Sequence, residues 1–442
     1  MNRLWLVLVL VASTSIAFAQ KGKIKFEEYD LDNGLHVILH QDNTTPIVAV
    51  TVSYHVGSKN EEVGRTGFAH FFEHLLFEGS ENIERGEFDT YVTEAGGALN
   101  ANTSQDRTFY YEVLPSNEYK LGLWLESERM LHAVINEEGV ETQREVVKEE
   151  KRQRMDNQPY GSFLYEMFSR AYTVHPYRWI PIGSMEDLNA AQIDEFRAFY
   201  KKFYVPNNAC LSIAGDIDIK ETKEYIEKYF GSIPRGADVV QPTEVEPPLG
   251  GEKRATIYDN VQLPGFMMGY RVPPYTSADF YALEMAGYVL SNGQSSRLNK
   301  KLVEEDQSAL FVGAFPFPLE DGGLFVTFSI ANMGKSTSDL ETTIDAEIER
   351  LQTELISDSE YEKIMNQIEN DFVSSNGKIS GIAESLSDYY MYYGDANLIN
   401  TELELYKKVT KEDIMRVAKQ YLVKDNRVVL EYLPKSEEPT EN

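Results

Sequence analysis

Alternation of hydrophobic and polar residues predicts both strands and amphipathic helices in this chain. Residues 48–55 alternate with a period of two, as in a half-buried strand. Residues 98–114, rich in Thr, Phe, Tyr and Val, predict a strand pair or one long strand, and strands are also expected within 255–272 and 323–330. Helical spacing covers six further segments: 66–77, 116–132, 139–154, 279–290, 337–353 and 361–373.

These elements fall into two halves around a segment rich in Pro and Gly at residues 234–251, which we interpret as a linker. We expect one domain at 20–233, a second at 252–434, and a solvated tail at 435–442. Strands alternate with long helices, but not in the regular rhythm of a doubly wound sheet. The pattern therefore favours an α/β (α+β) protein with a helix-covered mixed sheet in each half.

The two halves have similar ends, which suggests an internal duplication. The first closes with a helical stretch after Asn189 and then FYVPNNACLSIAG from Phe203. The second closes with a helical stretch after Thr410 and then YLVKDNRVVLEYL from Tyr421. In both, an aromatic residue, a Val and an Asn precede a short apolar strand. Matching the two segments requires a gap of about three residues.

Charge excludes one class of partner. The 442 residues carry a formal net charge of −29, and nucleic-acid binding needs clustered Lys and Arg. Two interpretations of the acidity remain open: it serves solubility, or it forms an acidic wall that attracts basic peptides over long range.

The first nineteen residues have the pattern of a secretory signal peptide. Arg3 provides the positive charge, residues 4–12 form a short apolar run, and Ala17-Phe18-Ala19 is a cleavage signal that leaves Gln20 as the new N-terminus. An uncleaved anchor is the alternative, although the run is too short for an ordinary membrane span. We expect an exported protein, in the bacterial periplasm, with no stable membrane insertion.

The strongest chemical signal is His-Phe-Phe-Glu-His at residues 70–74. On a helix, His70 and His74 project from the same face one turn apart and can bind one cation, while Glu73 lies beside that face. The alternative is a set of polar groups that are hydrogen-bonded inside a core. A zinc site needs a third ligand. Cys210 is the single cysteine, so this ligand must be another His or a carboxylate, and the acidic run at residues 145–150 offers candidates.

Several motifs together resemble the pitrilysin/insulysin family of zinc peptidases, the inverzincins, over nearly the whole mature chain. The chain is similar in style to short exported bacterial members and to the mitochondrial processing peptidase β subunit. The motifs that carry the resemblance are HFFEHLLFEGS from His70, GGALNANTS from Gly96, EVVKEEKRQRMDNQPYG from Glu145, HPYRWIPIGSMEDL from His175 and GQSSRLNKKL from Gly293.

The resemblance implies specific roles for the site residues. His70, His74 and Glu150 would bind one Zn²⁺ per chain, and Glu73 would be the general base that activates a water molecule. Glu149 is the rival ligand, but on a helix it points about 100° away from Glu150. The family also implies two homologous domains that form half of a clamshell.

The segment GGALNANTS corresponds to the family's substrate-binding edge strand. Asn100 and Ala101 would pair there with the backbone of a peptide substrate, which suits varied sequences. The alternative is an ordinary turn and edge strand without a binding role.

Three positions depart from the family pattern. Gln143 stands where relatives often carry a Glu that supports the metal site. Val303 and Leu310 stand where single-chain members carry an Arg and a Tyr that contact substrate. We therefore expect a second, similar subunit to supply this Arg/Tyr pair in a heterodimer, although a homodimer remains possible.

The leading hypothesis is an exported zinc endopeptidase that cleaves unfolded peptides or oligopeptides. Two alternatives stay open: a catalytically inactive, peptidase-like structural or assembly subunit, and a peptide-binding module that does not cut. The chain has every residue of the expected metal site. This argues against an inactive structural or assembly subunit, because inactive relatives usually lose metal ligands.

Overall fold

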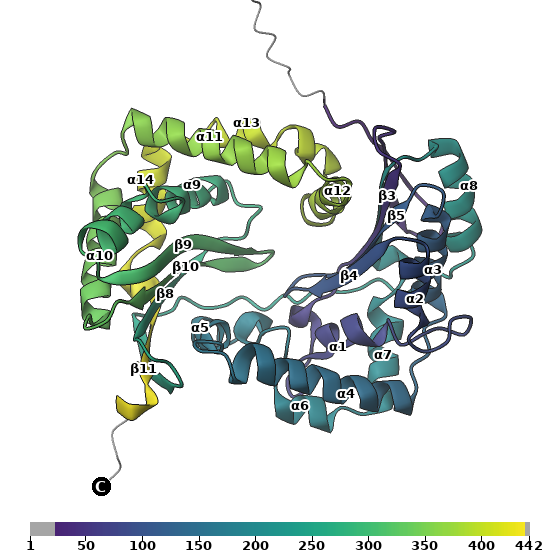
Figure 1. Ribbon diagram of the computed structural model, residues 1–442, viewed down its shortest axis with the longest axis horizontal. Coiled ribbons are helices and arrows are strands. Elements are labelled where there is room, and N and C mark those ends of the chain that lie inside the picture. The colour runs from purple at the N-terminus through teal and green to yellow at the C-terminus, as the bar shows by residue number, and fades with distance from the viewer. Residues whose placement is uncertain (1–22, 438–442) are drawn as a thin grey trace, which may run out of the picture.

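The computed structural model describes residues 23–437 and contains two mixed β-sheets, each packed with helices (Figure 1). The predicted fold class is confirmed. The expected signal peptide at 1–19 and the last residues of the expected tail, 438–442, lie outside the described residues. Within 23–437, no helix has the length and apolar character needed to cross a bilayer.

The first sheet has six strands in the order β1-β2-β6-β3-β5-β4. Strands β2 and β6 are parallel and all other neighbours are antiparallel. The segment expected as a strand pair or one strand is a pair, β4 and β5. The bounds are β1 Glu27–Asp30, β2 His36–Gln41, β3 Ile47–Tyr54, β4 Ala98–Thr103, β5 Thr108–Pro115 and β6 Ala209–Gly215.

Helices α1, α3, α7 and α8 cover one face of this sheet and form the main core of the first half. Cys210 lies buried in β6. The helices of the first half are α1 Phe68–Leu75, α2 Glu87–Glu94, α3 Tyr119–Leu131, α4 Glu137–Lys151, α5 Phe163–Ala171, α6 Met185–Ala190, α7 Ile193–Phe203 and α8 Ile219–Phe230.

The second sheet has five strands in the order β7-β11-β8-β10-β9, with β7 and β11 parallel and the other neighbours antiparallel. Its strands are β7 Lys253–Asp259, β8 Gly265–Val272, β9 Ala309–Leu319, β10 Gly322–Ala331 and β11 Arg427–Pro434. Its helices are α9 Phe280–Ser291, α10 Thr337–Thr353, α11 Asp358–Ser375, α12 Ile379–Tyr393, α13 Glu402–Tyr406 and α14 Lys411–Tyr421.

The closing segments of the two halves repeat the same structure. In each, a helix is followed by a 3₁₀ turn and then by the strand that enters the sheet next to its parallel neighbour. Asn208 Nδ2 donates to Phe203 O at 2.9 Å, and Asn426 Nδ2 donates to Tyr421 O at the same distance. Helices α7 and α14 have the same length of 11 residues, so the expected three-residue gap is wrong.

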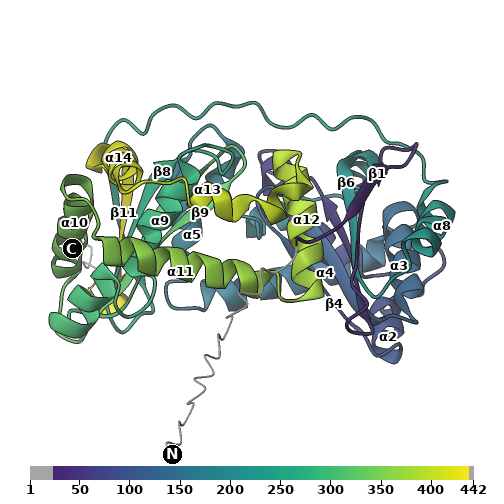
Figure 2. The same cartoon turned by 90° about the horizontal axis from the view of Figure 1, so that it is seen from above.

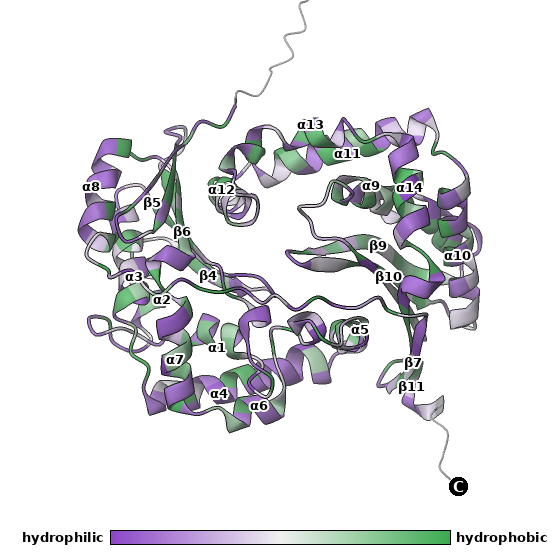
Figure 3. Ribbon diagram, turned by 180° about the vertical axis from the view of Figure 1, so that it is seen from behind, coloured by the Kyte–Doolittle hydropathy of each residue, from purple (hydrophilic) through white to green (hydrophobic). Residues whose placement is uncertain are grey.

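Each half contributes one helix that packs on the sheet of the other half. Helix α5 of the first half packs on the second sheet, where Met167 and Phe168 join Val428 and Leu430 in one core. Helix α12 of the second half packs on the first sheet through residues such as Leu386. Figure 1 shows α12 beside β3, and Figure 3 shows hydrophobic residues concentrated in strands such as β6 and β10. The two halves are therefore interlocked.

A buried charge cluster and the linker complete the junction. Lys59 Nζ lies 3.2 Å from Asp106 of the first half and 2.5 Å and 3.3 Å from Glu320 and Asp321 of the second. The segment at 234–251 has no regular secondary structure and runs along one side of the molecule between the halves (Figure 2).

Candidate metal centre

Helix α1 carries the His-Phe-Phe-Glu-His motif and is buried except around Glu73 and His74. Its N-terminus is held by a buried carboxylate from an earlier loop. Glu61 accepts hydrogen bonds from the backbone N–H groups of Gly67 and Ala69, both at 2.9 Å. Its two carboxyl oxygens satisfy backbone amides that have no partner inside the helix, and burial raises the pKa of Glu61. Gly67 enters the helix with φ of 94°, a conformation that favours glycine.

The C-terminal end of α1 is held by two other buried side chains. Tyr110 O–H donates to Phe72 O at 2.9 Å, and Arg129 Nη1 donates to Leu76 O at 2.7 Å. Arg129 is compensated by an ion pair with Glu126 at 3.0 Å. Fixed at both ends, α1 presents its two histidines in a defined orientation.

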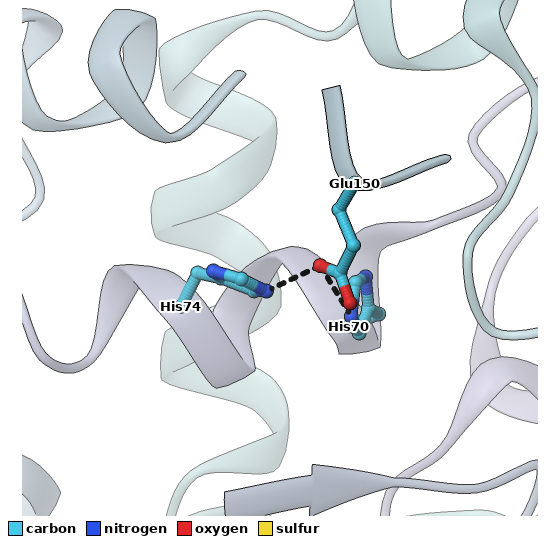
Figure 4. A group of neighbouring side chains, drawn as sticks. All are labelled: His70, His74 and Glu150. Atoms are coloured by element: carbon cyan, nitrogen blue, oxygen red, sulfur yellow. Dashed lines mark ion pairs between the residues drawn. The ribbon is translucent and has the colours of Figure 1, made fainter. Parts of the chain in front are cut away.

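Three of the predicted metal-site residues converge (Figure 4). Glu150 Oε2, near the end of α4, lies 3.0 Å from His74 Nε2 and 3.4 Å from His70 Nε2. One ligand atom from each residue lies within 4.8 Å of the others, and this is the one such group among the described residues. Asn136 caps the start of α4 by accepting from Gly139 N, and the helix carries Glu150 across the open edge of α1.

The local electrostatics suit metal ligation. Burial, reinforced by His74, lowers the pKa of His70 to about 4, so its imidazole is neutral near pH 7 and keeps a free lone pair. For Glu150, burial acts in the opposite direction, but hydrogen bonding to His74 and the nearby cationic groups lower its pKa. Two imidazole nitrogens and one carboxylate oxygen are a donor set that Zn²⁺ takes in sites with one open position.

Glu73 faces the same cavity, which has a volume of about 980 Å³ and is open between α1, α4 and β4. Burial raises the pKa of Glu73. Glu149 also borders this cavity, but its carboxylate is engaged by Arg152 at 3.1 Å and by Gln153 at 3.0 Å. The structure thus brings Glu150 to the histidine pair and turns Glu149 away from it.

Asn100 and Ala101 lie on β4, one of the two edge strands of the first sheet, and line the same cavity. Asn100 Oδ1 accepts from the backbone N–H of Ala101 at 2.9 Å. The side-chain amide nitrogen of Asn100 remains available for another partner.

The positions that depart from the family pattern do not line this cavity. Gln143 Nε2 donates to Glu78 Oε1 at 2.5 Å. Val303 lies in the turn at Asn299–Glu305 and Leu310 in strand β9, where it is largely exposed. No Arg/Tyr pair is formed by these positions.

Sequence reasoning missed the side chains that hold α1. Glu61 precedes the helix by too many residues to match a local capping motif, and Arg129 reaches α1 from α3. It also missed Arg154, which pairs with Glu150 at 2.7 Å. The spacing of four residues between them was a usable signal for a helical ion pair.

The sequence matches two family descriptions: "Insulinase (Peptidase family M16)" over residues 36–177, and "Peptidase M16 inactive domain" over residues 190–368. It is 32% identical over 417 residues to a zinc protease, PqqE, of Helicobacter pylori, covering 93% of this chain and 94% of that protein. A probable mitochondrial-processing peptidase subunit beta of Schizosaccharomyces pombe is 24% identical, with 92% and 90% covered.

Solved structures have the same fold. A protease from Helicobacter pylori matches with a TM-score of 0.88 and 31% identity, covering 93% of this chain and 100% of that one. The periplasmic protease PqqL from Escherichia coli matches with a TM-score of 0.74 at 18% identity, covering 92% of this chain but 47% of that one. The fold described here thus corresponds to about half of that longer chain.

Proposed function

The chain belongs to peptidase family M16, and on that premise we propose that it is a zinc-dependent endopeptidase acting on unfolded peptides. The observation that carries the proposal is the convergence of His70, His74 and Glu150 beside an open cavity that also contains Glu73. Relatives named as zinc proteases support the choice of metal.

In the proposed roles, His70 and His74 would hold the ion through imidazole nitrogen and Glu150 through a carboxylate oxygen. The ion would supply Lewis-acid chemistry, which makes a water molecule more acidic and polarises the scissile carbonyl. Glu73 accepts the proton of the attacking water and passes it to the leaving amine nitrogen.

Strand β4 is proposed to bind the substrate backbone. It is an edge strand that borders the cavity, so an extended peptide added there passes close to Glu73 and the metal ligands. Asn100 and Ala101 would provide contacts independent of substrate side chains.

The test combines metal content with turnover of an unstructured peptide. Glu73→Gln should retain zinc and lose about 10²–10⁴-fold in turnover, because general-base catalysis contributes on this scale. Glu150→Gln should lose zinc, whereas Glu149→Gln should keep it. A bound metal whose removal leaves turnover unchanged would contradict the proposal, and a correctly folded protein unable to bind zinc would favour an inactive structural or assembly subunit.

We further propose that a second peptidase-like subunit completes the working enzyme. Val303 and Leu310 provide no Arg/Tyr pair, the chain corresponds to 47% of the PqqL chain, and one relative is named as a subunit. Full peptidase activity from the purified monomer would rule out the need for this partner.

Export to the periplasm is also a proposal, supported by the pattern at residues 1–19. Fractionation of cells and N-terminal sequencing would test it. The proposal expects a periplasmic protein beginning at Gln20, and a cytoplasmic protein beginning at Met1 would contradict it.

A further inference from the structure

Arg154 places a positive charge at the edge of the metal cavity. Among the residues that line this cavity, it is the single Lys or Arg. It lies in the π-helical turn at Arg152–Asp156 that continues α4, and 78% of its side chain is exposed. The guanidinium is therefore accessible to a molecule entering the cavity.

The carboxylates on the same wall already have cationic or amide partners on their own helix. Glu145 pairs with Lys148 at 2.8 Å, and Glu149 pairs with Arg152 at 3.1 Å. These local pairs leave the wall less acidic than its composition indicates.

Arg154 pairs with a proposed metal ligand, unlike Lys148 and Arg152. Nη1 of Arg154 lies 2.7 Å from Oε1 of Glu150, while Oε2 of Glu150 faces the two imidazoles. A divalent ion held by the imidazoles and Oε2 would neutralise most of the charge of Glu150. The ion pair between Arg154 and Glu150 would then be weak, and the guanidinium at the exposed rim of the site could bind another anion.

We propose that Arg154 is a specificity-determining residue that binds a carboxylate of the peptide substrate close to the scissile bond. The proposal rests on the proposed peptidase function and deepens it. A planar guanidinium with several N–H donors forms two parallel hydrogen bonds to a carboxylate, and this geometry selects Asp or Glu over a neutral amide. The carboxylate is either an acidic side chain or the C-terminus of a short peptide.

The local charge at Arg154 is opposite to that of the whole chain. The net charge of −29 repels acidic peptides at long range, but exposed charges are screened beyond about 8 Å at physiological ionic strength. Recognition by Arg154 acts at contact distance. It should therefore appear in affinity and KM at physiological salt, with a smaller effect on kcat.

Binding to the zinc-loaded Glu73→Gln protein separates recognition from turnover. Three peptides with amidated C-termini would carry Asp, Asn or Lys at one position beside the scissile bond, and a fourth would carry Asn with a free C-terminal carboxylate. Calorimetry or fluorescence anisotropy should give about tenfold tighter binding for a carboxylate-bearing peptide than for the amidated Asn peptide. Which peptide shows the gain identifies the source of the carboxylate.

Arg154→Gln, introduced into the Glu73→Gln protein, should abolish the preference for carboxylate-bearing peptides. Arg154→Glu in the same protein should shift the preference toward the Lys peptide. Arg152→Gln is the matched control, because Arg152 is also an exposed arginine on this turn but does not line the cavity. In that control the preference should be unchanged.

Two results would overturn the proposal. One is equal affinity for all four peptides. The other is an Arg154→Gln variant that weakens all peptides equally and lowers zinc affinity in a chelator competition, because Arg154 would then act only by supporting Glu150. Failure of the proposed function is distinguishable, because the protein with Glu73 intact would then cleave none of these peptides even when zinc is bound.

Discussion

The two halves share an arrangement of five strands, since β2-β6-β3-β5-β4 matches β7-β11-β8-β10-β9. They differ where α1 packs on α4 and α9 packs on α11. In the first half these helices bring together two histidines and Glu150. In the second half, Tyr288 O–H on α9 donates to Asp371 Oδ2 on α11 at 2.7 Å. All seven histidines precede the linker. The comparison teaches that the scaffold is common to both halves, while the metal-binding chemistry depends on a few side chains of one helix pair.

The largest expected effect comes from disabling this helix pair in one half only. His74→Ala should lower zinc affinity by more than about 10²-fold, since loss of even an outer hydrogen-bond partner of a metal ligand costs about 10–100-fold. Tyr288→Phe, which removes one hydrogen bond in the second half, should leave zinc content unchanged. Metal analysis after dialysis checks both variants, and zinc loss in Tyr288→Phe would contradict the assigned difference.

The exchanged helices should make the two halves unfold together. Met167→Ala on α5 and Leu386→Ala on α12 each remove a fully buried side chain from the sheet of the opposite half. Each should lower the free energy of unfolding by about 2–5 kcal/mol. Chemical denaturation followed by two probes should show one shared transition, and separate transitions would show that the halves are independent.

Close packing of α5 depends on a glycine in the second sheet. A Cβ at Gly269 would lie 2.4 Å from Met167 Sδ. We expect Gly269→Ala to cost about 1–3 kcal/mol of unfolding free energy through overpacking. In the Met167→Ala background the same substitution should cost less, and an equal cost in both backgrounds would exclude this contact as the cause.

The smallest expected effect is a pH dependence that belongs to the second half. Burial raises the pKa of Glu284 from its ordinary 4.5 to about 7. The folded state therefore retains a proton that the unfolded state releases, so stability falls as pH rises from about 4.5 to 7. Glu284→Gln should remove this pH-dependent contribution to stability. Denaturation across this pH range should show that the variant becomes more stable relative to the native protein as pH rises. A difference in unfolding free energy that does not change with pH would contradict the assignment.

The sequence predicted the elements whose signal is local. The spacing of His70 and His74 places both on one helical face, and period-two alternation identifies β3. Strand β9 was not predicted, because Pro316 and Pro318 argue against a strand, yet an edge position tolerates them.

Long-range contacts limited the remaining predictions. The acidic run at 145–150 contains several carboxylates, and the family resemblance was needed to favour Glu150 before the structure placed it beside the histidines. The apolar faces of α5 and α12 do not indicate which sheet they cover. The position of Arg154 at the cavity likewise depends on how α4 crosses α1.

A crystal structure of the zinc-loaded protein, with anomalous data collected at the zinc absorption edge, tests the central claim most directly. The account predicts one anomalous peak within about 2.0–2.2 Å of His70 Nε2, His74 Nε2 and a carboxylate oxygen of Glu150. A metal bound elsewhere, or held by the two histidines with Glu149 in place of Glu150, would contradict it.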